Sequence, residues 1–208
     1  MITENKGVVT GILIAATLWF FMFSPWTAPM INFWGAMTFS AVILTCVSRW
    51  LCPEMFKELR FGGKQMVLGF AIAFVLWWVF WIGDKMSQLI FNFARPQVDM
   101  IYSMGNGTSS VIIAILLLLI IGPAEEIFWR GFVQRRLMLR FGSNIGFIAA
   151  TVCYALVHIW SFNFMLVMAA LVVGFCWGLT YRFFPRLLPA LIVSHAVWDA
   201  CAFVIFPF

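Results

Sequence analysis

Residues 110–130 have the sequence SVIIAILLLLIIGPAEEIFWR. A helix of about 20 apolar residues crosses the hydrocarbon of a bilayer. Residues 110–129 are long enough for such a helix and carry the adjacent Glu125 and Glu126 near their end, with Arg130 directly after them. The stretch therefore predicts a membrane-spanning helix that carries ionisable side chains. A Gly-Pro pair stands directly before the acids, and we expect it to kink the helix and turn freed backbone carbonyls toward a cavity.

The composition of the whole chain fits the same environment. Of the 208 residues, 64% are hydrophobic and 10% are charged, whereas a soluble globular domain carries roughly 25% charged residues. We therefore expect residues 1–208 to form a single integral membrane domain, with a motif-bearing core at about 110–207 and the lipid bilayer as a partner. The net charge of +5 is explained by basic loops, so nucleic-acid binding is not expected.

Apolar segments recur along the chain. Only helices satisfy their own backbone in lipid when the chain is open, so the expected fold class is all-α, a polytopic transmembrane helical bundle of about seven spans. In the segment 84–109, Met86, Leu89, Ile90 and Phe93 follow helical spacing, which predicts a short interfacial helix that covers the bundle or acts as a lid. The apolar segments are residues 8–23, 31–48, 66–83, 110–129, 145–160, 162–181 and 187–207.

Basic residues alternate between the connections. Those outside the basic connections are Lys85 and Arg95 in segment 84–109, Lys6 at the N-terminus, and Arg130 directly after the apolar run 110–129. This asymmetry predicts a cytoplasmic N-terminus and a C-terminus on the far side of the membrane. The compact length suits the plasma (inner) membrane of a bacterium or archaeon. The connections after spans two, four and six carry Arg49, Lys57, Arg60, Lys64, Arg135, Arg136, Arg140, Arg182 and Arg186.

A set of ionisable residues falls within or against the apolar runs. Such groups cost several kcal/mol at membrane depth unless they are paired or hydrated, and they mark functional sites by default. The remaining acids, Asp84 among them, are expected in termini or loops. The set comprises Glu125, Glu126, Arg130, His158, His195 and Asp199.

The spacing within this set divides it into pairs. Glu126 and Arg130 stand at i, i+4, the order that favours a helical ion pair. Glu125 is rotated by about 100° from its neighbour and is therefore expected to face a cavity. His195 and Asp199 are also at i, i+4, so the acid can orient the imidazole. A carboxylate near an imidazole can act as a general base on water, and further donors can stabilise an oxyanion. This set suits hydrolysis of an amide inside the membrane.

Three motifs occur in a fixed order. Residues 122–131, GPAEEIFWRG, resemble the EExxxR motif of the CPBP family, the CAAX proteases and bacteriocin-processing enzymes. Residues 154–158, YALVH, resemble its FxxxH motif with Tyr154 in place of phenylalanine. Residues 194–199, SHAVWD, resemble its third motif, a histidine followed four residues later by Asn or Asp. The ordered triplet resembles the Rce1-like, glutamate-dependent intramembrane proteases, and the first three spans carry no signature.

The resemblance implies roles for these residues. Glu125 and His158 would activate the water. Glu126 and Arg130 would form a structural pair. Tyr154 adds a hydroxyl within reach of the site, where the family has phenylalanine.

The third motif would bind the substrate's carbonyl oxygen or position the substrate. Because an ionised Asp199 cannot donate a hydrogen bond, whereas the Asn of the prenyl-protein proteases can, we expect it to orient His195. No cofactor is expected, since no HExxH helix is present. Zinc, if bound, would take Glu125, His158 and His195 as ligands.

The predicted spans place two of these residues at different depths. If the fifth span starts near Asn144, His158 lies about 20 Å across the membrane, whereas Glu125 lies near the cytoplasmic end of span four. Either the segment 127–141 bends along the interface or the span limits differ.

The function expected is an intramembrane endopeptidase acting on a membrane-associated protein or peptide, such as a prenylated or sorting-type C-terminal tail or a peptide precursor. A non-catalytic scaffold or regulator of a membrane partner is the alternative. A proton-coupled transporter is disfavoured because no inverted repeat is visible. At residue level, Glu125 could instead pair with Arg135 or Arg136 at the interface, and His158 could be a buried histidine satisfied by a carbonyl.

Overall fold

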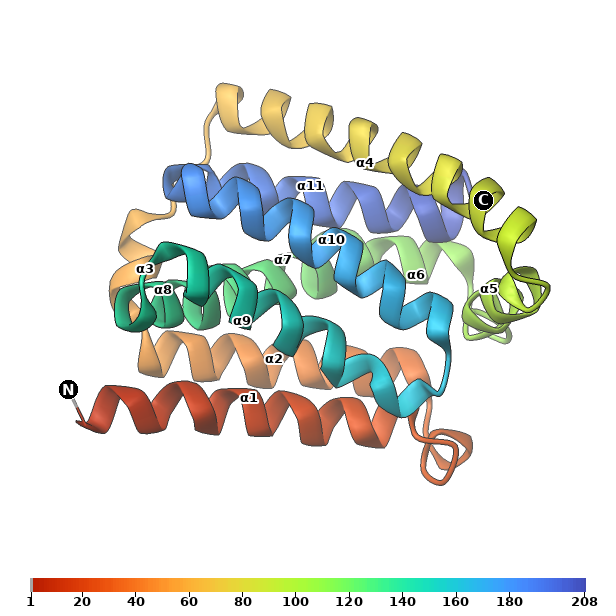
Figure 1. Cartoon of the computed structure of the whole chain (residues 1–208), viewed down its shortest axis with the longest axis horizontal. Coiled ribbons are helices and arrows are strands. Elements are labelled where there is room, and N and C mark those ends of the chain that lie inside the picture. Colours follow the sequence, from red (N-terminus) through yellow and green to blue (C-terminus); the bar gives the residue numbers. More distant parts are fainter. Residues whose placement is uncertain (1) are drawn as a thin grey trace.

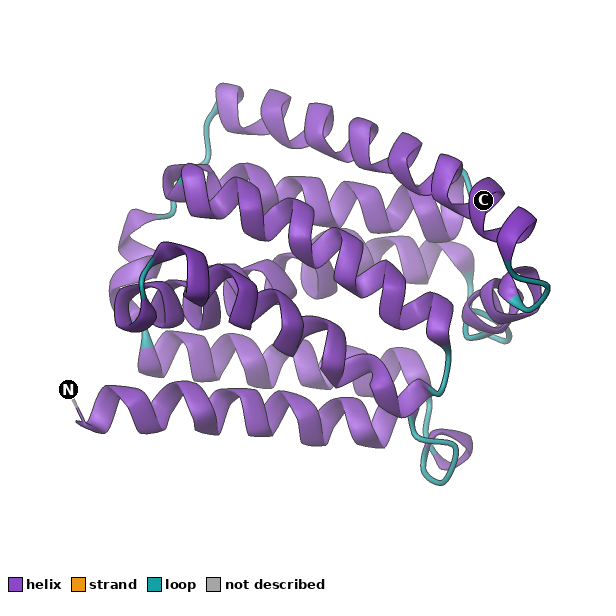
Figure 2. Ribbon diagram, viewed as in Figure 1, coloured by secondary structure: helices purple, strands orange, loops and turns teal. Residues whose placement is uncertain are grey.

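Helices make up every regular element between residues 2 and 208, the range that the computed structural model describes (Figure 2). Side chains are described from residue 7 onward, so the side chain of Lys6 lies outside the described residues. The all-α prediction is confirmed. The α-helices are α1 (Ile2–Phe23), α2 (Phe33–Leu51), α3 (Pro53–Glu58), α4 (Gly63–Ile90), α5 (Ala94–Ser103), α6 (Ser110–Leu116), α7 (Gly122–Glu126), α8 (Arg135–Phe141), α9 (Ser143–Leu156), α10 (Phe164–Phe183) and α11 (Leu188–Ala200).

The long helices run back and forth across the bundle (Figure 1). Among the described residues, 6 helices are long and apolar enough to cross a membrane, and Gly7–Phe23 of α1 is a shorter apolar helix. Large apolar side chains point outward, among them Leu13, Val67 and Leu119, which are 62%, 69% and 72% exposed. Such a surface is stable against lipid and not against water, so the chain is a multi-pass membrane protein.

The segment between the third and fourth spans contains a short helix, α5, as expected. However, Met86, Leu89 and Ile90 belong to the last turns of α4 and do not form part of a separate helix. Asp84 lies in the same helix and is buried, which corrects the expectation that it occupies a loop. Its carboxylate can be buried because it accepts hydrogen bonds from Gln88 Nε2 at 2.6 Å and Lys85 Nζ at 3.1 Å.

The motif-bearing helix is longer than its apolar run. Helices α6, α7 and α8 form one continuous helix, Ser110–Phe141, with π-helical stretches on both sides of α7. Extra residues per turn of this kind are found frequently at functional sites. Since the helix continues to Phe141, Glu125 and His158 both lie about 22–24 Å from the α8–α9 turn. The span limit at residue 129 is therefore wrong, and the two residues lie at similar depth.

Helix α7 touches α11 through glycine. A Cβ atom built on Gly122 would lie 2.7 Å from Ala196 Cα and 2.8 Å from its nitrogen. The absence of a side chain therefore lets the two helices that carry the first and third motifs approach closely.

We expect Gly122→Ala to destabilise the protein by about 1–3 kcal/mol, although Gly→Ala within a helix is usually stabilising. The cleavage rate should fall by more than the loss of folded protein explains, because a displacement of about 1 Å in a catalytic group lowers the rate about 100-fold. Thermal unfolding in detergent and cleavage assays measure the two effects. Gly63→Ala in α4 is the matched control, since a Cβ there meets nothing within 4 Å; equal behaviour of the two variants would contradict the close contact.

The basic connections gather at one end of the bundle. Helix α3, the α8–α9 turn and the α10–α11 turn lie at the end that also holds the N-terminus, and the C-terminus lies at the opposite end (Figure 1). The basic residues that recur in alternate connections of the sequence are thus concentrated at one end of the folded bundle.

Candidate active site

A buried ion pair lies at the centre of the bundle. Arg130 Nη1 donates to Glu126 Oε1 at 2.7 Å, and the two side chains are 2% and 0% exposed. The guanidinium carbon lies 4.7 Å from the ring centre of Tyr154 and 5.4 Å from that of Trp177. Its Nη2 reaches the carbonyl of Gly174 at 3.4 Å. The contact predicted from i, i+4 spacing is present, and aromatic faces from α9 and α10 enclose it.

His195 extends this pair toward α11. Its Nδ1 lies 2.9 Å from Glu126 Oε1 and, because that oxygen belongs to an ion-paired carboxylate, Nδ1–H is the donor. The imidazole stacks on Trp177 at 4.0 Å between ring centres. Nε2 lies 3.4 Å from Asp199 Oδ2, a weak contact by hydrogen-bond standards. Glu126 is therefore the closer of the two carboxylates that orient His195.

Glu125 has a different surrounding from its neighbour. It is 5% exposed, and its Oε2 accepts a hydrogen bond from the Tyr154 hydroxyl at 3.0 Å. Tyr154, which stands where the family motif has phenylalanine, thus contacts Glu125, the acid that the resemblance implies is catalytic.

The interface alternative for Glu125 is contradicted. Arg135 binds Glu58 at 2.7 Å, and Arg136 binds Glu54 at 2.9 Å. Both arginines pair with acids of α3, so Glu125 remains with the buried site.

His158 is held through both ring nitrogens. It lies in the 3₁₀ turn Val157–Ser161 that follows α9. Nδ1 is 2.8 Å from the carbonyl oxygen of Tyr154, and since a carbonyl only accepts, Nδ1 carries the proton. Nε2 then accepts from the indole of Trp19 at 3.0 Å. The contact of the alternative interpretation, a buried histidine bound to a carbonyl, is thus present at Nδ1. The contact with Trp19 comes from α1, which carries none of the three motifs.

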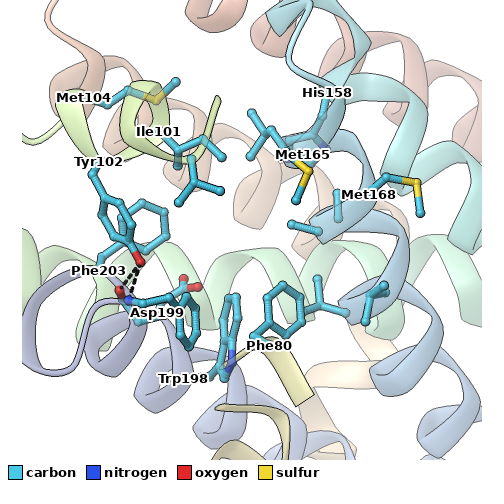
Figure 3. A pocket seen from close by; sticks show the side chains of 18 of the residues that line it. Phe80, Ile101, Tyr102, Met104, His158, Met165, Met168, Trp198, Asp199 and Phe203 are labelled. Atoms are coloured by element: carbon cyan, nitrogen blue, oxygen red, sulfur yellow. Dashed lines mark hydrogen bonds between the residues drawn. The ribbon is translucent and has the colours of Figure 1, made fainter. Parts of the chain in front are cut away.

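These side chains open on one cavity of about 500 Å³ (Figure 3). Its walls come mainly from α2, α4, α5, α10 and α11, and they are largely apolar. Figure 3 shows His158 and Asp199 on different walls, with Tyr102 of α5 and Phe203 nearby. The lining includes Glu125, Tyr154, His158, His195, Asp199 and the buried Asp84.

The cavity occupies one half of the bundle. From Glu125 and His195 it extends toward α5 and the end of α4, away from the basic connections (Figure 1). The cavity therefore lies toward the end of the bundle opposite α3 and the α8–α9 turn.

A zinc ion does not fit the arrangement of the candidate ligands. Both ring nitrogens of His158 are engaged, by Tyr154 and Trp19, and His195 faces a carboxylate through each nitrogen. Among the residues that the structure describes, no three His, Cys, Asp or Glu side chains come together as a metal site. The ligand set of Glu125, His158 and His195 is therefore not assembled for a metal.

The arrangement can be compared with known families. Residues 107–201 match the family model described as Type II CAAX prenyl endopeptidase Rce1-like. This region is Rce1-like. The match confirms the resemblance to the CPBP family read from the three motifs and supports a membrane protease function. Comparisons with curated proteins and with solved structures gave no match.

The Rce1-like region supplies only part of the site. It contains α6 to α11 and the six polar residues of the site, whereas α1 to α5 lie outside the matched residues. Trp19, which binds His158, and much of the cavity wall come from this N-terminal part. These contacts therefore involve residues outside the matched region.

Proposed function

We propose that the chain is an intramembrane endopeptidase of the glutamic type, with Glu125 as the general base. The observation that supports this most strongly is the contrast between two adjacent carboxylates. Glu126 is fixed by Arg130 and His195, while Glu125 opens on the cavity and holds a single hydrogen bond from Tyr154.

The reaction would use these groups in sequence. Glu125 takes a proton from water, whose oxygen attacks the carbonyl carbon of a peptide bond in the cavity. The negative charge that forms on the carbonyl oxygen is stabilised by Nε2–H of His195 in its doubly protonated form, since Nδ1–H already donates to Glu126, and Glu126 and Asp199 orient the ring. Glu125 then returns the proton to the departing amine, and a carboxylic acid and an amine leave.

His158 requires a rearrangement to take part. For this residue to share in water activation, as the family resemblance implies, its Nε2 must exchange the Trp19 indole for the water. In the structure described, His158 instead anchors Tyr154 through the backbone, and Tyr154 in turn binds Glu125.

Tyr154→Phe tests the hydroxyl contact. The substitution restores the family's residue and removes one hydrogen bond, so we expect kcat to fall about three- to tenfold with KM nearly unchanged. Steady-state kinetics and a pH profile measure the effect, because a lost donor to Glu125 shifts the profile. Tyr181→Phe is the control, since Tyr181 is a buried tyrosine outside this cavity. An unchanged kcat and pH profile for Tyr154→Phe would remove the hydroxyl from the mechanism.

We further propose that the basic end of the bundle is cytoplasmic, so that substrates enter from the far side. In a chain with its native cysteines replaced, Asn106→Cys should react with a membrane-impermeant maleimide added outside intact cells. Arg140→Cys in α8 should react only after permeabilisation. The reverse pattern would contradict this orientation and place the cavity mouth in the cytoplasm.

The activity itself is tested in cells. Membrane proteins should be compared by mass spectrometry between cells expressing the wild-type chain and cells expressing Glu125→Gln. A peptidase predicts precursors that accumulate in the variant and shortened products that are lost. A phenotype that survives this substitution would instead favour a scaffold or regulator.

A further inference from the structure

A second cavity lies at the basic end of the bundle. It has a volume of about 430 Å³ and is formed by the α3–α4 connection, the start of α8, and the α10–α11 turn. It is separate from the site of the proposed peptidase, since the two cavities share no lining residue.

The charge of this cavity is unbalanced. Its lining contains Lys57, Arg60, Arg135 and Arg186, with Glu58 as the acid. Arg135 donates hydrogen bonds to the carboxylate of Glu58 from both terminal nitrogens, at 2.7 Å and 2.8 Å. The other three basic side chains, Lys57, Arg60 and Arg186, therefore line the cavity without a further carboxylate in the lining to balance them.

The start of α4 adds further donors. Gly62 is the N-cap of this long helix and provides no side-chain hydrogen bond. A Cβ atom on either Gly62 or Gly63 would meet nothing within 4 Å, and residues 61–64 are exposed, so the start of the helix is uncovered. Free amides at a helix start favour an anion, and here they adjoin polar side chains of the same cavity, Arg60 before them and Gln65 after them.

Exposed aromatic side chains flank the same connections. Phe61 is 55% exposed, and Phe183 and Phe184 are each 59% exposed. They stand next to Arg60 and directly before the α10–α11 turn. A basic pocket with apolar side chains beside it fits an amphiphile better than a free ion, because the aromatic rings can contact acyl chains.

We propose that this cavity binds the phosphate headgroup of an anionic phospholipid. The phosphate contacts Arg60, Arg186 and Lys57, and the acyl chains lie along the exposed apolar surface at the start of α4. The site would anchor the α3–α4 connection and the α10–α11 turn to the membrane surface.

The test uses native mass spectrometry of the full chain released from three preparations. These are nanodiscs of phosphatidylcholine alone, nanodiscs containing some phosphatidylglycerol, and phosphatidylcholine nanodiscs with added inorganic phosphate. The variant is Arg60→Gln with Arg186→Gln. The matched control, Arg49→Gln with Arg140→Gln, removes equal charge at the same end of the bundle but outside the cavity. All four side chains replaced are exposed at the surface, so folding, checked by thermal unfolding in phosphatidylcholine, should be retained.

We expect the wild-type chain and the control to retain phosphatidylglycerol in preference to phosphatidylcholine. The cavity variant should bind it about fivefold more weakly for each basic side chain removed. Equal losses of phosphatidylglycerol binding in the cavity variant and the control would overturn the proposal. The lipid would then be attracted by the overall positive charge of this end of the bundle and not by the cavity. Retention of inorganic phosphate without preference for phosphatidylglycerol would also overturn it in favour of a free anion. Neither outcome depends on peptidase activity, so this proposal and the proposed function fail separately.

Discussion

Glu125→Gln is expected to reduce the rate of peptide cleavage by about 10²–10⁴-fold, the contribution usual for a general base. The amide has nearly the shape of the carboxylate and can still accept the hydrogen bond from Tyr154, but it cannot take a proton from water. KM should change little, because the apolar cavity that would hold the substrate is unaltered. Steady-state kinetics with purified protein in proteoliposomes measure both constants.

Glu54→Gln is the matched control for this prediction. Glu54 pairs with Arg136 at the surface and lies outside both cavities. Its replacement should leave kcat within about twofold, as is usual for a surface pair. A Glu125→Gln variant as active as this control would exclude Glu125 as the base.

Arg130→Met is expected to have the largest effect on stability, about 3–5 kcal/mol, because it leaves the carboxylate of Glu126 buried without its ion-pair partner. The lost contacts with Tyr154 and Trp177 add to this cost. Thermal and chemical unfolding in detergent measure the effect. Arg135→Met, at a pair whose acid Glu58 is 59% exposed in its side chain, should cost less than about 1 kcal/mol.

A double variant separates the effect of the unpaired buried charge on stability from the effect of the lost packing contacts. Glu126→Gln combined with Arg130→Met removes both charges and should recover much of the lost stability. Activity should remain low, because His195 loses the carboxylate that orients it. If the double variant were no more stable than Arg130→Met alone, the buried charge would not be the cause of the loss.

Local contacts of the site could be predicted from the sequence, because they follow helical periodicity. The Glu126–Arg130 contact and the neighbouring positions of His195 and Asp199 are each one turn apart on a single helix. The position of Glu125 on a different face follows from the same geometry.

Contacts between helices could not be predicted in this way. The bond from Trp19 to His158 joins residues 139 positions apart, and the bond from His195 to Glu126 joins residues 69 apart. No spacing within one helix encodes such distances. The expectation of a loop at Asp84 fails for a different reason, because α4 continues to Ile90 beyond the apolar run and Gln88, one turn later on the same helix, binds the carboxylate.

The end of the fourth span shows the limit of hydropathy. Arg135, Arg136 and Arg140 interrupt the apolar run, so the predicted span ends at residue 129. Arginine and leucine are good helix formers, and Arg135 and Arg136 pair with α3 at the end of the bundle, so the helix continues to Phe141. This extension brings Glu125 to the depth of His158 and resolves the separation expected from the sequence.

The proposed chemistry rests on Glu125 directing hydrolysis without a metal. The decisive experiment is cleavage of a transmembrane peptide library in H₂¹⁸O by the purified chain, in proteoliposomes treated with a chelator. We expect the wild-type chain, but not Glu125→Gln, to produce new peptide C-termini that carry ¹⁸O. Cleavage that persists in Glu125→Gln, or that requires zinc to be added back, would contradict this role of Glu125.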